Sequence, residues 1–188
     1  MNNQEILTLL TELHVLREGH FLLTSGRHSD RFLLCSQLTM HPDATEELIK
    51  ELALKIRDLK PTVVIGPAMG GVILAYELAR ALGCRAMFAE KDGDKMAMKR
   101  GFVLTEEDRV VIIEDAVSTG GSICKVVEVV EQSPATLVGV AALFDRTAGQ
   151  VEFNGVPFVS LMEIEISSYD PEHCPLCLAN QPLLKPKS

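Results

Sequence analysis

Two acidic residues and a loop of hydroxyl-bearing and glycine residues follow one apolar segment of the chain. Residues 110–113 form a continuous β-branched run, which is typical of a strand buried on both faces of a parallel sheet. Glu114 and Asp115 come next, at the carboxyl end of the strand, where open α/β sheets bind ligands. The loop at 118–122 then offers backbone N–H groups, hydroxyls and the start of a helix to an anion. Carboxylates beside such a loop predict a sugar phosphate as the ligand.

A second apolar segment ends in a similar loop. Residues 62–65 predict a buried strand, and the sequence Gly-Pro-Ala-Met-Gly-Gly at 66–71 separates it from a helical pattern that runs to Leu82. The alternative to a second phosphate site is close packing of helix on strand, which also requires small residues. The predicted contacts of this second loop are Ala68, Met69 and Gly70.

Positive charge is concentrated in the segment between two predicted strands at 88–102. It is too long for a tight turn and too poor in apolar residues for a core helix. It therefore predicts a mobile lid, and a solvated hairpin is the alternative. Its candidate catalytic cations are Lys91, Lys95, Lys99 and Arg100.

Composition limits the classes of function. A chain of 188 residues with 47% hydrophobic residues supports one well-packed domain. Its net charge of −8 and isoelectric point near 5.1 count against a nucleic-acid-binding protein, because phosphate backbones are held mainly by clustered Lys and Arg. The sequence has neither the roughly 20 apolar residues of a membrane span nor the pattern of a signal peptide. We expect a cytoplasmic protein with no nucleic-acid or membrane partner.

The cysteines fit a reducing compartment, since their number, five, is odd and three of them lie in apolar contexts. Cys174 and Cys177 are the exception, because they form a Cys-Pro-Leu-Cys motif directly after His173. The motif could be half of a zinc site or a redox pair, but a four-ligand zinc site needs more ligands than this segment offers. We therefore expect a buried turn here and no metal held directly by the protein.

The predicted elements alternate between helix and strand, which is typical of an α/β fold. Helices are expected at 4–16, 42–59 and from 70 to 82, with a further helix after 122. Strands are expected at 21–24, 31–34, 62–65, 85–89, 109–113, 137–143 and 158–161.

The strand, acidic pair and loop at 110–122 closely resemble the phosphoribosyl pyrophosphate (PRPP) signature of type I phosphoribosyltransferases. The resemblance implies a mainly parallel central sheet flanked by helices, with a small hood built from the N- and C-terminal segments. It implies that Glu114 and Asp115 hold the ribose hydroxyls. It also implies a pyrophosphate-binding loop with a non-proline cis peptide near Ala68–Met69, a lid shared across a homodimer, and Mg²⁺ bound through PRPP. The implied PRPP contacts of the main loop are Ala116, Val117, Ser118, Thr119, Gly120, Gly121 and Ser122.

The segment at 19–30, together with the motifs above and the terminal Cys-Pro-Leu-Cys, looks most like the Thermus-type branch of bacterial orotate phosphoribosyltransferases. Such enzymes join orotate to PRPP, giving orotidine 5′-phosphate and pyrophosphate in pyrimidine synthesis. A plain surface turn with Phe32 in the core is the alternative for the 24–32 region. The orotate contacts implied by the resemblance are Thr24, Ser25, Arg27, Phe32 and Arg146.

These expectations amount to one domain over 1–188, with a hood at roughly 1–40 and 160–188 and a core at roughly 41–159. Two other functions stay open at this point. The same fold could transfer phosphoribose to a purine base, or the chain could be a regulator that binds PRPP without catalysis. The 19–30 segment counts against the purine transferase, and the acidic net charge together with the predicted lid counts against the regulator.

Overall fold

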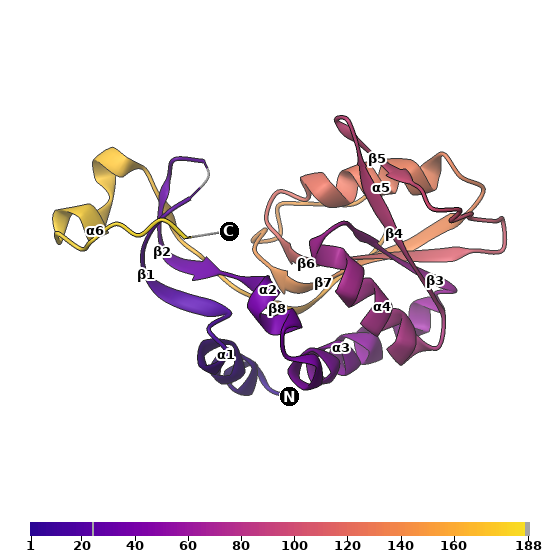
Figure 1. The fold of residues 1–188 in the computed structure, drawn as a ribbon, viewed down its shortest axis with the longest axis horizontal. Helices are drawn as coiled ribbons and strands as arrows, with labels where there is room; N and C mark the ends of the chain where they lie inside the picture. Colours follow the sequence, from indigo (N-terminus) through magenta and orange to yellow (C-terminus); the bar gives the residue numbers. More distant parts are fainter. Residues whose placement is uncertain (24, 187–188) are drawn as a thin grey trace. The chain divides into compact units, whose positions relative to one another are not determined.

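The chain folds into two compact units in the computed structural model, which describes residues 1–23 and 25–186 (Figure 1). The first unit comprises Met1 and His41–Glu163, and the second comprises Asn2–Met40 and Ile164–Ser188, as far as the described residues reach. Thr24, a predicted orotate contact, lies outside the described residues. Among those that are described, no helix is both long and apolar enough to cross a membrane.

A six-stranded sheet forms the centre of the first unit. Its strands are β3 (Val63–Pro67), β4 (Arg85–Asp92), β5 (Lys95–Met98), β6 (Arg109–Val117), β7 (Thr136–Asp145) and β8 (Phe158–Glu163). They are ordered β5-β4-β3-β6-β7-β8, and every pair of neighbours is parallel except β4 and β5. The mainly parallel sheet expected from the sequence is confirmed.

Helices cover both faces of this sheet (Figure 1). They are α3 (Pro42–Ile56), followed by the single turn η1 (Arg57–Leu59), α4 (Gly70–Leu82) and α5 (Gly121–Glu131). The apolar face of α5 packs on strand residues that share one side of the sheet, including Val63, Ile65, Val110 and Ile112. Alternate residues of the same strands, such as Val111, are equally buried on the side of α3 and α4. The apolar runs of the central strands therefore reflect burial on both faces.

Strand β6 is longer than the apolar run predicts. It continues through Val117, because residues beyond Ile113 still find partners on β7, for example Glu114 opposite Ala142. Its pairing with β3 ends earlier, at Ile65 opposite Ile112. The acidic pair therefore lies within a strand that is paired on one side, next to the loop that follows β3.

Two glycines allow α4 to begin directly against the sheet. A Cβ atom at Gly71 would lie 2.9 Å from the Cα of Gly66 and 3.0 Å from the carbonyl oxygen of Ile113. A Cβ atom at Gly66 would collide with the backbone of Gly71. Close packing, the alternative explanation of this loop, thus accounts for these two glycines.

The segment predicted as a lid is a β-hairpin. Strands β4 and β5 pair antiparallel from Ala89 opposite Met98 to Asp92 opposite Lys95. The two residues between them form a tight turn in which Gly93 has a φ of 61°. The segment therefore folds as the hairpin that the sequence analysis named as the alternative to a lid. Movement of this hairpin over a ligand stays a prediction.

The second unit is a three-stranded sheet with short helices. Its elements are α1 (Asn3–Glu12), β1 (Leu16–Leu22), β2 (His28–Leu33), α2 (Cys35–Thr39), β9 (Ser168–Tyr169), η2 (Pro171–His173) and α6 (Pro175–Leu178). The prediction of one helix over 4–16 is wrong at its end. Helix α1 stops at Glu12 because His14 takes a positive φ of 56°, and Leu16 already belongs to β1.

We predict that Gly71→Ala lowers the free energy of unfolding by about 1–3 kcal/mol, since the added methyl group meets backbone atoms that cannot rotate away. Chemical denaturation monitored by circular dichroism measures the change. Gly121→Ala is the matched control, because its nearest atom is the Thr119 hydroxyl at 3.8 Å. Equal stability of the two variants would contradict the packing role of Gly71.

Candidate active site

A cavity of about 480 Å³ opens where β6 runs into α5. The loop after β6, the first turns of α5 and the tip of the β4–β5 hairpin form its walls. Every residue of the predicted phosphate loop from Ala116 to Ser122 lines it, as does Glu114. The other lining residues are Lys91, Gly93, Asp94, Lys95, Met96, Ile123 and Lys125.

The loop places hydrogen-bond donors and a helix N-terminus on this cavity. Gly120 precedes α5 with a φ of 73°, a conformation that favours glycine, and a Cβ there would lie 2.9 Å from the Phe153 ring. The side chains of Ser118, Thr119 and Ser122 are exposed. Free N–H groups at the start of a helix, with hydroxyls beside them, suit a phosphate group.

Three lysines line the cavity together with the predicted phosphate loop. Lys91 and Lys95, two of the predicted lid cations, come from the two strands of the hairpin and line the cavity. Lys125, which the sequence analysis missed, comes from α5. Its spacing could have revealed it, because a residue four positions after Gly121 lies on the same face of a helix. The acids Asp94 and Glu114 are the only carboxylates among the lining residues.

Within the described chain, Lys99 and Arg100 do not line the cavity. The Lys99 Nζ donates to the Lys91 carbonyl oxygen and to Asp92 Oδ1, both at 3.2 Å. Arg100 donates two hydrogen bonds, of 2.8 and 2.9 Å, to Glu90, and these bonds hold the pKa of Glu90 below its ordinary value. In this arrangement the two cations brace the hairpin.

The acidic pair has unequal electrostatics. Burial, together with the charge of Asp115, raises the pKa of Glu114 from 4.5 to about 8, although its Oε1 accepts a long 3.4 Å bond from the Asp115 N–H. Asp115 is oriented differently, because its Oδ1 accepts a 2.6 Å hydrogen bond from the Ala116 N–H. Glu114 therefore holds a proton over much of the neutral range when no ligand is bound.

The loop after β3 adjoins this pair. A Cβ atom at Gly70 would lie 3.2 Å from Asp115 Oδ2 and 3.6 Å from Glu114 Oε1. The peptide bond between Ala68 and Met69 is cis, as the family resemblance implied. The two predicted loops thus meet at the acidic pair, although Ala68, Met69 and Gly70 are not among the residues that line the cavity.

The predicted orotate contacts are distributed over both units. Arg146 follows β7 in the first unit, and its backbone N–H donates to the Val117 carbonyl oxygen at 2.8 Å. In the second unit, Arg27 donates to the hydroxyl and carbonyl oxygens of Ser168, both at 2.7 Å, and Ser25 is exposed. Phe32 is half-buried, with its ring centre 5.7 Å from that of Phe21. Their role in binding a base stays a prediction.

Comparison with known proteins identifies the family. Residues 36–173 match the phosphoribosyl transferase domain family. The chain belongs to the phosphoribosyltransferases. Orotate phosphoribosyltransferases from Caldanaerobacter subterraneus and Heliobacterium modesticaldum are 44% and 46% identical to it, over 100% of this chain and 98% and 99% of theirs. The solved orotate phosphoribosyltransferase of Mycobacterium tuberculosis matches with a TM-score of 0.71 and 25% identity, covering 85% of this chain and 95% of that one.

Membership of the phosphoribosyltransferases agrees with the sequence analysis in two respects. The expected α/β fold is confirmed by the sheet and helices of the first unit and by the structural match. The identification of the family from the motif at 110–122 is also confirmed. In this phosphoribosyltransferase, that motif forms one wall of the cavity.

We predict that Glu114 makes stability depend on pH. The folded state retains a proton up to about pH 8 that the unfolded state loses near pH 4.5, so the stability of the ligand-free protein falls as the pH rises through this window. Glu114→Gln carries an uncharged side chain at every pH. The melting temperature of this variant minus that of the parent should therefore rise between about pH 4.5 and about pH 8 and stay constant at higher pH. Calorimetry at a series of pH values measures this. Ser122→Ala, in the same cavity but without a titrating group, is the control, and a constant difference for Glu114→Gln would refute the pKa.

Proposed function

We propose that this phosphoribosyltransferase transfers the phosphoribosyl group of PRPP to orotate, giving orotidine 5′-phosphate and pyrophosphate. The observation that carries the proposal is the cavity in which the phosphate loop, Glu114 and three lysines converge. The similarity to curated orotate phosphoribosyltransferases over the full length of the chain supports orotate as the base.

The arrangement suits the reaction because each wall of the cavity faces a different part of PRPP. The loop from Ser118 to Ser122 and the start of α5 would hold the 5-phosphate. Glu114 and Asp115 would accept hydrogen bonds from the ribose hydroxyls. The bond from the anomeric carbon to pyrophosphate breaks and a bond to a ring nitrogen of orotate forms, so no nucleophile of the protein is required.

Charge stabilisation is the main catalytic contribution we assign to the protein. Negative charge develops on the departing pyrophosphate, and Lys91 and Lys95, which line the cavity, would stabilise it. Fixed cations in a site that excludes water stabilise such charge more strongly than they would in bulk solvent. Closure of the hairpin over bound PRPP would provide that exclusion.

Mg²⁺ is the cofactor we propose. Magnesium prefers oxygen ligands, keeps several waters and is usually held through substrate phosphates. The lining suits an ion that is held through PRPP, because its oxygen groups are hydroxyls and the carboxyl groups of Asp94 and Glu114, and Glu114 is largely protonated before a ligand binds. When bound through PRPP, the ion would neutralise charge on the pyrophosphate.

For the base, we propose contacts from Ser25, Arg27, Phe32 and Arg146, with Thr24 as a further candidate. A planar guanidinium can bind the carboxylate of orotate through two parallel hydrogen bonds. An aromatic ring such as that of Phe32 can stack on a planar pyrimidine. The 2.7 Å bonds from Arg27 to Ser168 show how this guanidinium is oriented before a ligand arrives.

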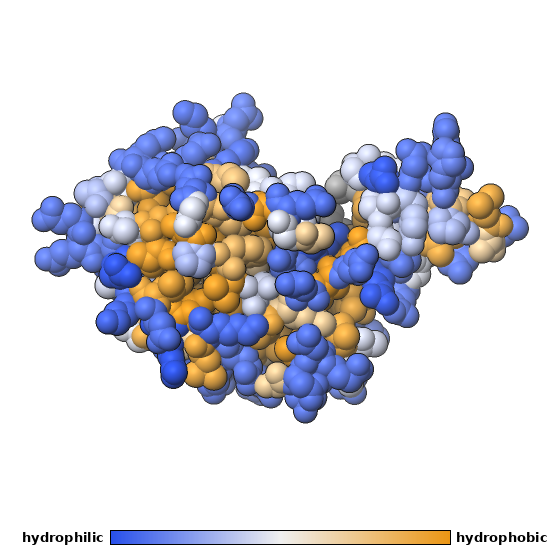
Figure 2. All heavy atoms as spheres, turned by 180° about the vertical axis from the view of Figure 1, so that it is seen from behind, coloured by the Kyte–Doolittle hydropathy of each residue, from blue (hydrophilic) through white to orange (hydrophobic). Residues whose placement is uncertain are grey.

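We further propose a cytoplasmic homodimer in which the hairpin serves the neighbouring site. Met69, Ile73 and Tyr76 form an exposed apolar stripe along the start of α4, with exposures of 84%, 49% and 63%. Apolar side chains also gather over a broad area of the first unit seen from behind (Figure 2). Exposed apolar patches of this kind often mark protein–protein contacts. The described residues include all five cysteines, and none of them forms a disulfide, which suits a reducing compartment.

The decisive assay supplies the purified protein with PRPP, Mg²⁺ and one base at a time. Orotate, uracil, adenine, hypoxanthine and xanthine form the panel, and pyrophosphate release is followed together with the nucleotide product. Pyrophosphate released with orotate alone supports the proposal. Turnover with a purine would replace it, and PRPP binding without any turnover would favour a regulator.

We predict different effects for two lysines of the hairpin. Lys95→Ala should lower kcat by about 100-fold, with a smaller change in the KM for orotate, because it removes a cation from the cavity. Lys99→Ala is the matched control, since Lys99 is bonded within the hairpin, and its effect on kcat should be smaller. Steady-state kinetics measure both, and a pure loss of orotate affinity in Lys95→Ala would exclude the assigned role.

A further inference from the structure

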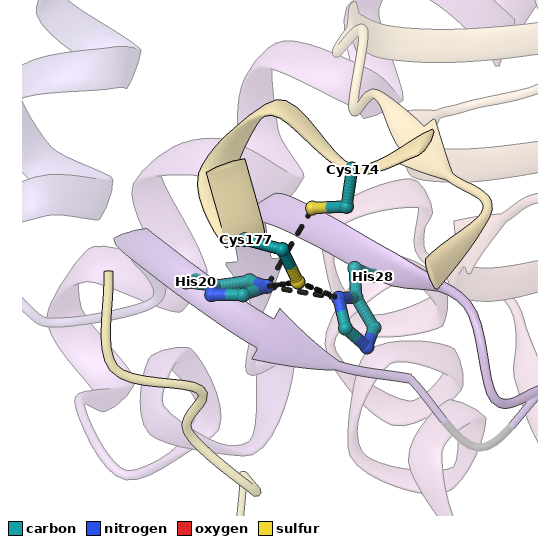
Figure 3. Close-up of side chains that lie close together, drawn as sticks. All are labelled: His20, His28, Cys174 and Cys177. Atoms are coloured by element: carbon teal, nitrogen blue, oxygen red, sulfur yellow. Dashed lines mark hydrogen bonds between the residues drawn. The ribbon is translucent and has the colours of Figure 1, made fainter. Parts of the chain in front are cut away.

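Four side chains of types that can bind a metal meet in the second unit, and none of them has been given a role above. They are His20 on β1, His28 on β2, and Cys174 and Cys177 at the start and within α6 (Figure 3). We call these four residues the Cys–His cluster. One ligand atom from each lies within 4.8 Å of all the others. The sequence analysis counted ligands in the C-terminal segment alone, and the fold adds two histidines from more than a hundred residues away.

The fold attaches both ends of the cysteine segment to the strands that carry the histidines. Before the cysteines, β9 pairs with β2 and places Tyr169 opposite His28. After them, the Leu184 N–H donates to the His20 carbonyl oxygen at 2.7 Å, and the Leu22 N–H donates to the Leu184 carbonyl oxygen at 2.9 Å. The Cys-Pro-Leu-Cys turn is therefore held over the β1–β2 hairpin by backbone pairing on either side.

The distances from His20 and His28 to their neighbours in the cluster are close to those of a tetrahedral zinc site. His20 Nε2 lies 2.9 Å from His28 Nδ1, 3.6 Å from Cys174 Sγ and 3.7 Å from Cys177 Sγ, and Cys177 Sγ lies 3.3 Å from His28 Nδ1. A zinc ion with Zn–S bonds of about 2.3 Å and Zn–N bonds of about 2.0 Å separates its ligand atoms by roughly 3.3–3.8 Å. The two nitrogens would have to part by about 0.4 Å, whereas the other three distances already fall within that range.

The hydrogen bonding of His20 prepares it as a ligand. Its Nδ1 lies 2.9 Å from the Gln181 carbonyl oxygen, and a carbonyl can only accept, so Nδ1 carries the proton. In the neutral ring, Nε2 then has a lone pair, and this atom faces the other three members of the cluster. A histidine that binds a metal with one nitrogen commonly donates from the other to a carbonyl in this way.

One nitrogen cannot satisfy three neighbours by hydrogen bonding, whereas one cation satisfies all four side chains. We propose that the Cys–His cluster binds a structural zinc ion. Two thiolates and two neutral imidazoles balance the charge of Zn²⁺, which suits a site where His20, His28 and Cys174 are 2%, 6% and 0% exposed. Soft sulfur and imidazole ligands in tetrahedral geometry select zinc over magnesium. Four protein ligands leave no open position for a substrate, so the role is structural.

The first test is the metal content of the full-length protein, purified without chelators or metal-affinity resin and measured by mass spectrometry. We expect one zinc ion per chain in the parent and none in Cys177→Ser. Cys177 is exposed, so this variant is expected to fold, while Cys174→Ser at a buried position is the second variant. Cys124→Ser, an exposed thiol on α5, and His173→Gln, from a separate exposed group with Asp170 and Glu172, are the matched controls and should keep their zinc.

The second test needs no variant. X-ray absorption at the zinc edge should show two sulfur ligands near about 2.3 Å and two nitrogen ligands near about 2.0 Å. A strong chelator should lower the melting temperature of the parent, zinc but not magnesium should restore it, and Cys177→Ser should not respond. Protein that neither contains zinc nor is stabilised by it, a disulfide between the two cysteines, or zinc that survives the loss of both thiols would each overturn the proposal.

Discussion

The candidate active site depends on the close approach of three backbone segments, at Gly66, Gly71 and Ile113. With no side chains between them, α4 begins against β3 and β6 together, and Gly70 at its first position adjoins the acidic pair. Strand β6 continues beyond its last pair with β3 and is held there by β7 alone. Two loops from neighbouring parallel strands are thereby brought to the same carboxylates, which is the general reason why such sheet edges bind ligands.

The local charge of the cavity is opposite in sign to the net charge of the chain. The protein carries a net charge of −8, yet three lysines face the cavity against Asp94 and a Glu114 whose pKa is raised to about 8. Near neutral pH much of Glu114 is therefore uncharged, and the local balance is positive. A small polyanion can bind in such a cavity, while the overall negative charge disfavours long polyanions such as nucleic acids.

The sequence predicts the centre of the fold well because burial leaves a direct signal. Continuous apolar runs mark the strands around Val63 and Val110, and glycine and hydroxyl residues mark the loops after them. Strand ends were predicted less well, because the extension of β6 depends on partners from β7, and the early end of α1 depends on the backbone of His14. The same limit applies to the site. The helical spacing from Gly121 to Lys125 was enough to predict that Lys125 faces the cavity. In contrast, His20 meets two cysteines that are distant in the sequence only because strands pair.

In the second unit, strand pairing brings the two histidines and the two cysteines together. Its sheet has three strands, of which β9 is two residues long. Hydrophobic burial therefore contributes less to the stability of this unit than it contributes to the first. His20 and His28 lie on the two strands that enter and leave the turn carrying Ser25 and Arg27. A cation that joins both strands to the C-terminal segment would fix the base of this turn in the folded state, and metal binding contributes directly to folding where a preformed site is absent from the unfolded chain. The cluster would then help to position the turn that we propose for orotate.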